Sequence, residues 1–315
     1  MLLGDAAVIR SRRPILARAG GRKVRTHDTL PALDSAMLTE LAARVDVVIL
    51  TKNEAARIER CIRAIPPGIN VYVLDSGSTD NTIRIATAVG GHVSVRDWQG
   101  FAAQRNFALE HCGTGPWVLF IDADETYPVS AWPEIAERTD GLKFDAFAVP
   151  SMLIYDGRML MHAPGYPLLH VRLVRRDRVQ FAAGTTGHGE ALVGSPRVGT
   201  MRCFYVHDWF DGDVDRWLRK NLVLALAEAG AAAPANVRET ARARTSARVG
   251  NGPHRPLVRF VYHWLLVGGW RDGWRGFEYA LLYCWYELTR YVSWSARRRR
   301  ERVQDSAHKD ETPHG

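Results

Sequence analysis

The chain has 315 residues, of which 46% are hydrophobic and 24% are charged, and this composition excludes wholly disordered, collagen-like and disulfide-scaffold proteins. The 42 Lys and Arg residues against 34 Asp and Glu residues give a net charge of +8. Much of this charge lies at the ends, because residues 1–36 contribute +4 and residues 295–315 contribute +2. The basic ends favour contact with an anionic surface over binding of nucleic acid, for which we expect no role.

The sequence also bears on location. No uncharged apolar stretch reaches 18 residues, and the N-terminal residues lack the apolar core of a signal peptide. The four cysteines are far apart and include no Cys-x-x-Cys pair, which is typical of reduced thiols. We therefore expect a cytoplasmic protein, either soluble or attached peripherally to the inner face of the cell membrane.

Residues 1–43 are rich in Arg, Ala and Gly, show no sustained periodicity and are predicted to be a flexible extension; Met37 is an alternative start. Apolar strands are then expected at residues 45–50, 71–74, 93–95 and 117–121. Between them, helices are expected after residue 57 and over residues 80–89 and 101–111. This alternation predicts an α/β fold with a doubly wound, mostly parallel, Rossmann-like sheet.

The same domain is predicted to cover residues 44–229, with further strands at 146–150 and 168–174 and a helix over 214–229. The remainder of the chain divides into a linker (230–255), a C-terminal amphipathic helical region (256–296) and a disordered polar tail (297–315). One face of the helical region carries Phe277, Ala280, Leu281, Cys284, Trp285, Leu288, Tyr291 and Val292. That face either completes the core or lies in a membrane interface beside the basic tail.

Carboxylates follow three of the predicted strands, at Glu54, Asp75 and the pair Asp122 and Asp124. Any one of them alone could be a helix cap, but ligands bind at the carboxyl ends of strands in an open parallel sheet. Two carboxylates two residues apart after a buried strand suit a hard divalent cation. We therefore expect Mg²⁺ or Mn²⁺ at Asp122 and Asp124.

Four segments, residues 47–54, 74–82, 104–108 and 121–125, together resemble the family 2 glycosyltransferases, which have the GT-A fold. More narrowly, the chain is similar to the branch that contains lipopolysaccharide core β-glucosyltransferases. The resemblance covers roughly residues 45–294. It includes residues 268–277, which are similar to that branch's Gly-Phe-x-Asp-Gly-x-x-Gly-Phe.

The resemblance implies a nucleotide-diphosphate sugar as donor, with a UDP-hexose expected. The residues that it assigns to donor binding are Thr51, Asn53, Glu54, Asp75, Ser76, Arg105 and Asp122. Among these, Asp75 would bind the base, and Arg105 would lie near the diphosphate unless it is only a solvated helix position. The metal ligands would be Asp124 and Asp122, with His207 completing the shell unless it is a core histidine.

Inverting transfer needs a base that takes the proton of the acceptor hydroxyl. The resemblance points to Glu190, with His188 as its rival, although the intervening Gly189 departs from the adjacent His and Glu of many relatives. The segment of Arg172, Arg175 and Arg176 resembles a basic motif of the branch. These arginines either contact the acceptor or a phosphate, or they only form a basic strand edge.

Together these features predict an inverting, metal-dependent glycosyltransferase acting on a cell-envelope glycan or a lipid-linked saccharide. A polyprenyl-phosphate glycosyltransferase is the enzymatic alternative, because a phosphate oxygen needs no strong base. A non-catalytic nucleotide-sugar-binding relative is the alternative from another class.

Overall fold

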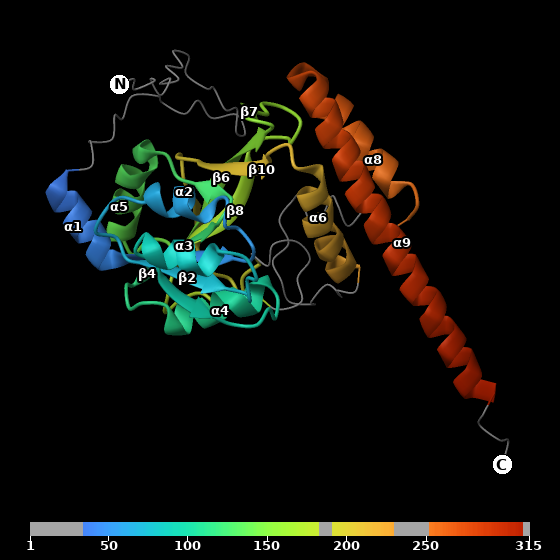
Figure 1. Ribbon diagram of the computed structural model, residues 1–315, viewed down its shortest axis with the longest axis horizontal. Coiled ribbons are helices and arrows are strands. Elements are labelled where there is room, and N and C mark those ends of the chain that lie inside the picture. Colours follow the sequence, from blue (N-terminus) through green and yellow to red (C-terminus); the bar gives the residue numbers. More distant parts are fainter. Residues whose placement is uncertain (1–33, 183–190, 230–251, 311–315) are drawn as a thin grey trace.

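The computed structural model describes residues 34–182, 191–229 and 252–310. Within them a ten-stranded sheet has helices on both faces, and a helical C-terminal unit lies beyond it (Figure 1). Hydrogen-bonded neighbours follow the order β3-β2-β1-β4-β8-β6-β10-β5, with β7 and β9 paired to β6. The predicted α/β fold with a doubly wound sheet is thereby confirmed.

The first half of the sheet is parallel, as expected from its alternating strands and helices. Its strands are β1 (Val45–Thr51), β2 (Val71–Asp75), β3 (His92–Val95) and β4 (Trp117–Asp122). The helices between them are α2 (Ile58–Arg63), α3 (Thr82–Ala88) and α4 (Phe101–His111). Parallel pairing brings the carboxyl ends of β1, β2 and β4 to one edge of the sheet.

The second half of the sheet is mixed. Its strands are β5 (Glu125–Thr126), β6 (Ala146–Tyr155), β7 (Arg158–Met159), β8 (Leu168–Arg175), β9 (Val198–Thr200) and β10 (Tyr205–Phe210). Strand β8 runs antiparallel to both β4 and β6, whereas β10 runs parallel to β6. The 3-10 turn η1 (Val129–Ala131) and helix α5 (Trp132–Asp140) precede β6, and neither α5 nor β10 was predicted.

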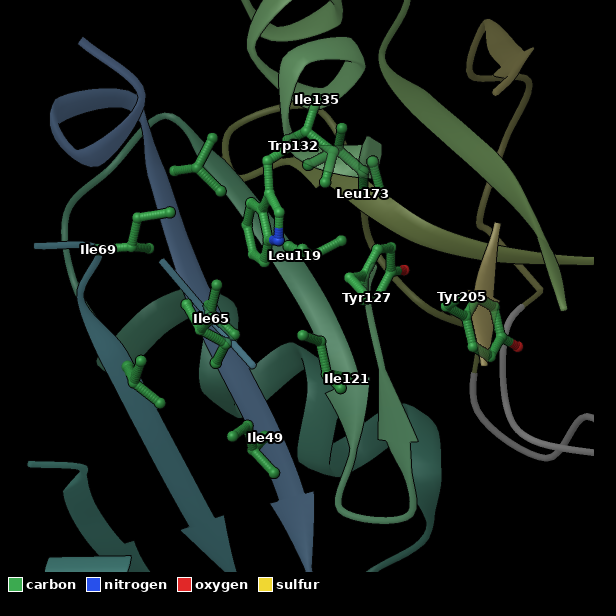
Figure 2. Packing of buried hydrophobic residues seen from close by; sticks show 14 of the residues in the cluster. Ile49, Ile65, Ile69, Leu119, Ile121, Tyr127, Trp132, Ile135, Leu173 and Tyr205 are labelled. Carbon is green, nitrogen blue, oxygen red and sulfur yellow. The ribbon is translucent and has the colours of Figure 1, made fainter. Parts of the chain in front are cut away.

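Strand β1 is buried on both faces, which explains its continuous apolar run. Val47 and Ile49 join a cluster with Leu119 and Trp132 on one face (Figure 2). On the other face, Val48 joins a second cluster that includes the apolar side of α4. The alternation of side chains along a strand thus assigns successive residues to two separate cores.

The N-terminal prediction needs correction, because residues 35–44 are not part of a flexible extension but form helix α1 (Ser35–Arg44). Asp34 caps it by accepting a hydrogen bond from the Met37 N–H at 2.8 Å. Leu41 is fully buried, and Arg44 pairs with Asp140 of α5. The helix contributes too few core residues to show a periodicity in the sequence. Residues 1–33 lie outside the described part of the chain.

The C-terminal unit consists of α6 (Val214–Glu228), α8 (Arg255–Val261), the π-helical turn η2 (Tyr262–Leu266), the 3-10 turn η3 (Gly269–Asp272) and α9 (Trp274–Asp310). Figure 1 shows α6 between the sheet and the long helix α9. The predicted disordered tail is wrong up to residue 310, because α9 continues through the arginine run. Residues 230–251 of the predicted linker lie outside the part of the chain that the structure describes, and residue 255 already belongs to α8.

The motif over residues 268–277 attaches this unit to the sheet. The carboxylate of Asp272 accepts hydrogen bonds from the backbone N–H groups of Met161, His162 and Ala163, at 2.7–3.0 Å. A Cβ atom on Gly276 would collide with the carbonyl oxygen of Gly269, so this turn requires glycine. The motif is therefore explained by packing and hydrogen bonding between η3, α9 and the loop after β7.

A buried ion-pair cluster holds α8 to α9. Glu287 of α9, only 3% exposed, lies 2.7 Å from Arg255 Nε, 3.3 Å from Arg259 Nε and 2.9 Å from Arg290 Nη2. Burial raises the pKa of Glu287, but the three guanidinium groups outweigh this effect and leave the pKa below its ordinary value of 4.5.

We predict that Glu287→Gln lowers the free energy of unfolding by about 3 kcal/mol at pH 7, because it leaves buried guanidinium groups without their carboxylate. Since the pKa of Glu287 is lowered in the folded state, its stabilising effect is present above pH 4.5 and is lost as the pH falls through the lowered pKa. Urea denaturation at several pH values should show the two proteins converging in acid. Glu301→Gln, an exposed change on the same helix, is the control; an equal loss there, or a difference independent of pH, would contradict the prediction.

Candidate active site

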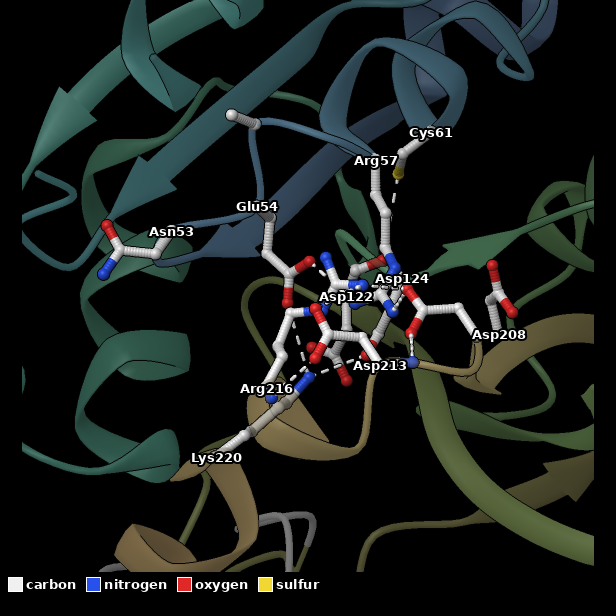
Figure 3. A network of polar contacts seen from close by, with 12 residues as sticks. Asn53, Glu54, Arg57, Cys61, Asp122, Asp124, Asp208, Asp213, Arg216 and Lys220 are labelled. Atoms are coloured by element: carbon white, nitrogen blue, oxygen red, sulfur yellow. Dashed lines mark hydrogen bonds and ion pairs between the residues drawn. The ribbon is translucent and has the colours of Figure 1, made fainter. Parts of the chain in front are cut away.

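Glu54 and Asp124 meet at the carboxyl edge of the parallel strands, and one ammonium group lies between them (Figure 3). Glu54 follows β1 and Asp124 follows β4. Lys220 of α6 places its Nζ atom 2.7 Å from Asp124 Oδ2 and 3.4 Å from Glu54 Oε1. Two of the predicted strand-end carboxylates therefore come together as expected, with a lysine that the sequence analysis did not select.

The pKa of Asp124 is set by the burial of its carboxylate and by two basic neighbours. Burial raises its pKa, but Lys220 and then His207 outweigh burial and hold the pKa well below the ordinary value of 3.8. The Nε2 atom of His207, on β10, lies 3.6 Å from Asp124 Oδ2. Burial lowers the pKa of His207, but Asp124 more than offsets this and the pKa is raised. Asp124 is thus an ionised carboxylate whose Oδ2 atom faces both Lys220 and His207.

Asp122 and Glu125 share the guanidinium group of Arg172, which β8 places beside β4. Arg172 Nη2 lies 3.0 Å from Asp122 Oδ2 and 2.5 Å from Glu125 Oε1. Arg172 and Glu125 are almost completely buried, and burial raises the pKa of Glu125 to about 8 against the opposing effect of Arg172. Arg172 therefore holds Asp122 and Glu125, the first and last residues of the acidic loop 122–125, to strand β8.

A second carboxylate loop follows β2. Asp75 is fully buried, and its Oδ1 atom accepts hydrogen bonds from the N–H groups of Gly77 and Ser78 at 2.9 and 2.7 Å. Its Oδ2 atom accepts another from the Ser78 hydroxyl. The Ser76 hydroxyl oxygen accepts a hydrogen bond from Gln104 Nε2 at 3.0 Å. Asp75 thus fixes the conformation of the loop that is predicted to bind the nucleotide base of the donor.

The loops after β1 and β2 are tied together by Asn53, which has a positive φ of 55°. Its side-chain oxygen accepts a hydrogen bond from the Thr79 N–H at 2.8 Å, and its own N–H donates to the Ser78 hydroxyl at 2.8 Å. The Ser76 N–H donates to the carbonyl oxygen of Thr51. The predicted donor residues of these two loops therefore form one continuous rim.

Two arginines brace the same edge, Arg57 immediately before α2 and Arg216 in α6. Arg57 Nη1 lies 3.0 Å from Glu54 Oε2, and Arg57 also pairs with Asp211, which Arg216 contacts as well. Burial lowers the pKa of Arg57, but Glu54 and the other carboxylates outweigh it and raise the pKa. Negative and positive groups thus alternate across the site.

Other predicted residues are not brought to this point. Arg105 is fully buried in α4, with its guanidinium carbon 5.4–5.8 Å from the ring centroids of Phe101, Phe120 and Phe181. The alternative of a solvated helix position is therefore wrong, and its contact with a diphosphate stays a prediction. Glu190 and His188, the two candidate bases, lie outside the described residues.

Arg175 and Arg176 lie away from the carboxyl edge. Arg176 Nη2 pairs with Asp46, the second residue of β1, at 2.8 Å, and it also donates to carbonyl oxygens at the end of α4. Arg175 is opposite Trp117, the first residue of β4. These two arginines therefore support the amino ends of the strands, and only Arg172 of the basic segment reaches the acidic loop.

The donor set fits a divalent cation in its chemistry. Asp124 and His207 present a carboxylate oxygen and an imidazole nitrogen to one region, and Mg²⁺ or Mn²⁺ commonly takes few protein ligands together with substrate phosphates. Among the described residues, no three His, Cys, Asp or Glu side chains are grouped closely enough to hold a metal ion by themselves. Asp122 is engaged by Arg172, so its role as a ligand stays a prediction.

The fold and the site define an α/β domain whose acidic residues gather at the carboxyl edge of the sheet, which is the edge where ligands bind in open α/β sheets. Residues 46–189 match the family model described as glycosyl transferase family 2. This part of the chain is therefore similar to family 2 glycosyltransferases, and the match begins in β1 and includes the loops of Glu54, Asp75 and Asp124.

Similar proteins include an uncharacterized glycosyltransferase of Rickettsia bellii, 45% identical over 27% of this chain and 29% of that relative. Another is the lipopolysaccharide core biosynthesis glycosyltransferase LpsC of Rhizobium meliloti, 29% identical over 50% of this chain and 61% of LpsC. A crystal structure of S. aureus TarS 1–349 in complex with UDP-GlcNAc is 14% identical, with a TM-score of 0.43, and covers 81% of this chain and 92% of that one. The chain matches only about a third of the length of the Rickettsia relatives.

We predict that Lys220→Met raises the affinity for Mn²⁺ about tenfold or more, because the ammonium group no longer competes for Asp124. Isothermal titration with Mn²⁺ alone measures this without any turnover. Arg219→Met is the matched control, since it removes the same charge from the next residue, whose guanidinium group pairs with Asp215 at the surface. Equal affinities in wild type and Lys220→Met would refute the competition.

Proposed function

We propose that the protein is an inverting, metal-dependent glycosyltransferase that moves a sugar, expected to be a hexose from its UDP derivative, to a cell-envelope glycan or a lipid-linked saccharide. The observation that carries the proposal is the convergence of Glu54 and Asp124 on Lys220 at the carboxyl edge of a domain similar to family 2 glycosyltransferases. Similarity to LpsC supports a cell-envelope acceptor.

In the proposed mechanism, the two tied loops hold the nucleoside. Asp75 orients the rim that accepts the base, and Asn53 keeps that rim against the loop of Glu54. Asp124 and His207 would hold Mg²⁺ or Mn²⁺. A bound cation would neutralise the negative charge that develops on the departing nucleotide diphosphate.

The positive side chains of this chain would complete the charge balance. Lys220, whose side chain is about half exposed, is free to turn from Asp124 toward the diphosphate once a cation is bound. The acceptor hydroxyl attacks the anomeric carbon from the opposite face as Glu190, or alternatively His188, takes its proton. The reaction would take place in the cytoplasm.

The test is a panel of nucleotide sugars with and without Mn²⁺ or Mg²⁺, read by thermal shift and by donor hydrolysis. We predict that one nucleotide sugar raises the melting temperature of the wild type only when the metal is present. Asp124→Asn should lower the rate of hydrolysis of that nucleotide sugar about 100-fold or more, because charge on the leaving group is no longer neutralised. Asp177→Asn, an exposed carboxylate at the far end of β8, is the control and should behave as wild type.

Two outcomes would replace the proposal. Metal-dependent stabilisation without hydrolysis or transfer to any acceptor would indicate a non-catalytic nucleotide-sugar-binding protein. Transfer to a polyprenyl phosphate that survives Glu190→Gln and His188→Ala would indicate the polyprenyl-phosphate enzyme instead.

A further inference from the structure

One side of helix α9 is exposed in the part of the chain that the structure describes. Trp274, Leu281, Leu288 and Val292 are separated by seven, seven and four residues, so they share one face of the helix. Their side chains are 44–67% exposed, whereas Glu287 on the opposite side is buried against α8. The predicted apolar face is thus divided, with Ala280 in the core and this row at the surface.

Exposed apolar side chains also lie in the two turns that precede α9. Leu265, Leu266 and Trp270 belong to the short turns η2 and η3, which pack against α9, and they are 55–74% exposed. Together with the row on α9 they form what we call the C-terminal apolar face: Leu265, Leu266, Trp270, Trp274, Leu281, Leu288 and Val292. Exposed apolar residues in such a group mark an interaction surface, and tryptophan is favoured where a membrane meets water.

Basic residues flank this face at both ends. Arg271 and Arg275 lie beside Trp270 and Trp274, and residues 297–300, all arginine, are exposed at the other end. The row from Trp274 to Val292 spans about 27 Å along the helix, too far for a single anchor point and suited to a flat surface. Among the described residues, no helix is long and apolar enough to cross a bilayer.

We propose that the C-terminal apolar face docks on an anionic lipid surface, with α9 lying in the plane of the headgroups. The apolar side chains enter the interface and the flanking arginines meet the lipid phosphates. Charge complementarity favours lipid over a second copy of the chain, because dimerisation would bring two strongly basic segments into one assembly. Docking needs no donor, so its failure is distinguishable from failure of the proposed function.

The test is co-flotation of the full chain with vesicles, without nucleotide sugar. We expect wild type to bind vesicles of equal parts phosphatidylcholine and phosphatidylglycerol at least about tenfold more tightly than pure phosphatidylcholine. Trp270→Ser combined with Trp274→Ser should weaken binding to the anionic vesicles about tenfold or more. Val129→Ser, which removes a 77% exposed apolar side chain from η1, should bind as wild type.

Several results would overturn the proposal. Absence of wild-type binding, or equal binding of the double variant, would remove the lipid surface as the partner. Light scattering decides the remaining case: a dimer that the double variant loses would assign the C-terminal apolar face to a second copy of the chain. A far-ultraviolet circular dichroism spectrum and a thermal unfolding midpoint equal to those of wild type verify that the double variant is folded.

Discussion

The guanidinium group of Arg172 is the interaction on which the acidic edge of the sheet depends. Asp122, Asp124 and Glu125 bring three carboxyl groups into four residues at the end of a buried strand. Such a concentration of acid in a protein interior requires compensating positive charge, and Arg172, itself almost completely buried, supplies it to two of the three. Strand β8 can place the arginine there because it runs antiparallel beside β4.

The third carboxylate, Asp124, is compensated from elsewhere in the chain. His207 approaches it from β10 and Lys220 from α6. Helix α6 in turn packs on α9, where Trp217 contacts Trp285, and Arg297 donates to the carbonyl oxygen of Leu226. The helix that carries the ammonium group is therefore in contact with both the carboxyl edge and α9.

The parallel half of the fold could be predicted because local pattern and tertiary structure agree there, as in β1 and α4. The same regularity placed Glu54 and Asp124 at one edge. Lys220 could not be found this way, because nothing in the sequence distinguishes it from its charged neighbours on α6. Helix α1 and the continuation of α9 through residues 297–310 were missed because long-range packing and helix propagation, rather than an apolar period, decide them.

The hydrogen bonds of Asp272 also determine where the polypeptide can be divided. A protein shortened to residues 44–229 would keep every strand of the sheet but would lose the carboxylate that satisfies the N–H groups of Met161, His162 and Ala163. It would also uncover Trp209 and Trp217, which Tyr279 and Trp285 of α9 cover. The sheet and the C-terminal helices are thus one folding unit, although the sequence divides them into separate segments.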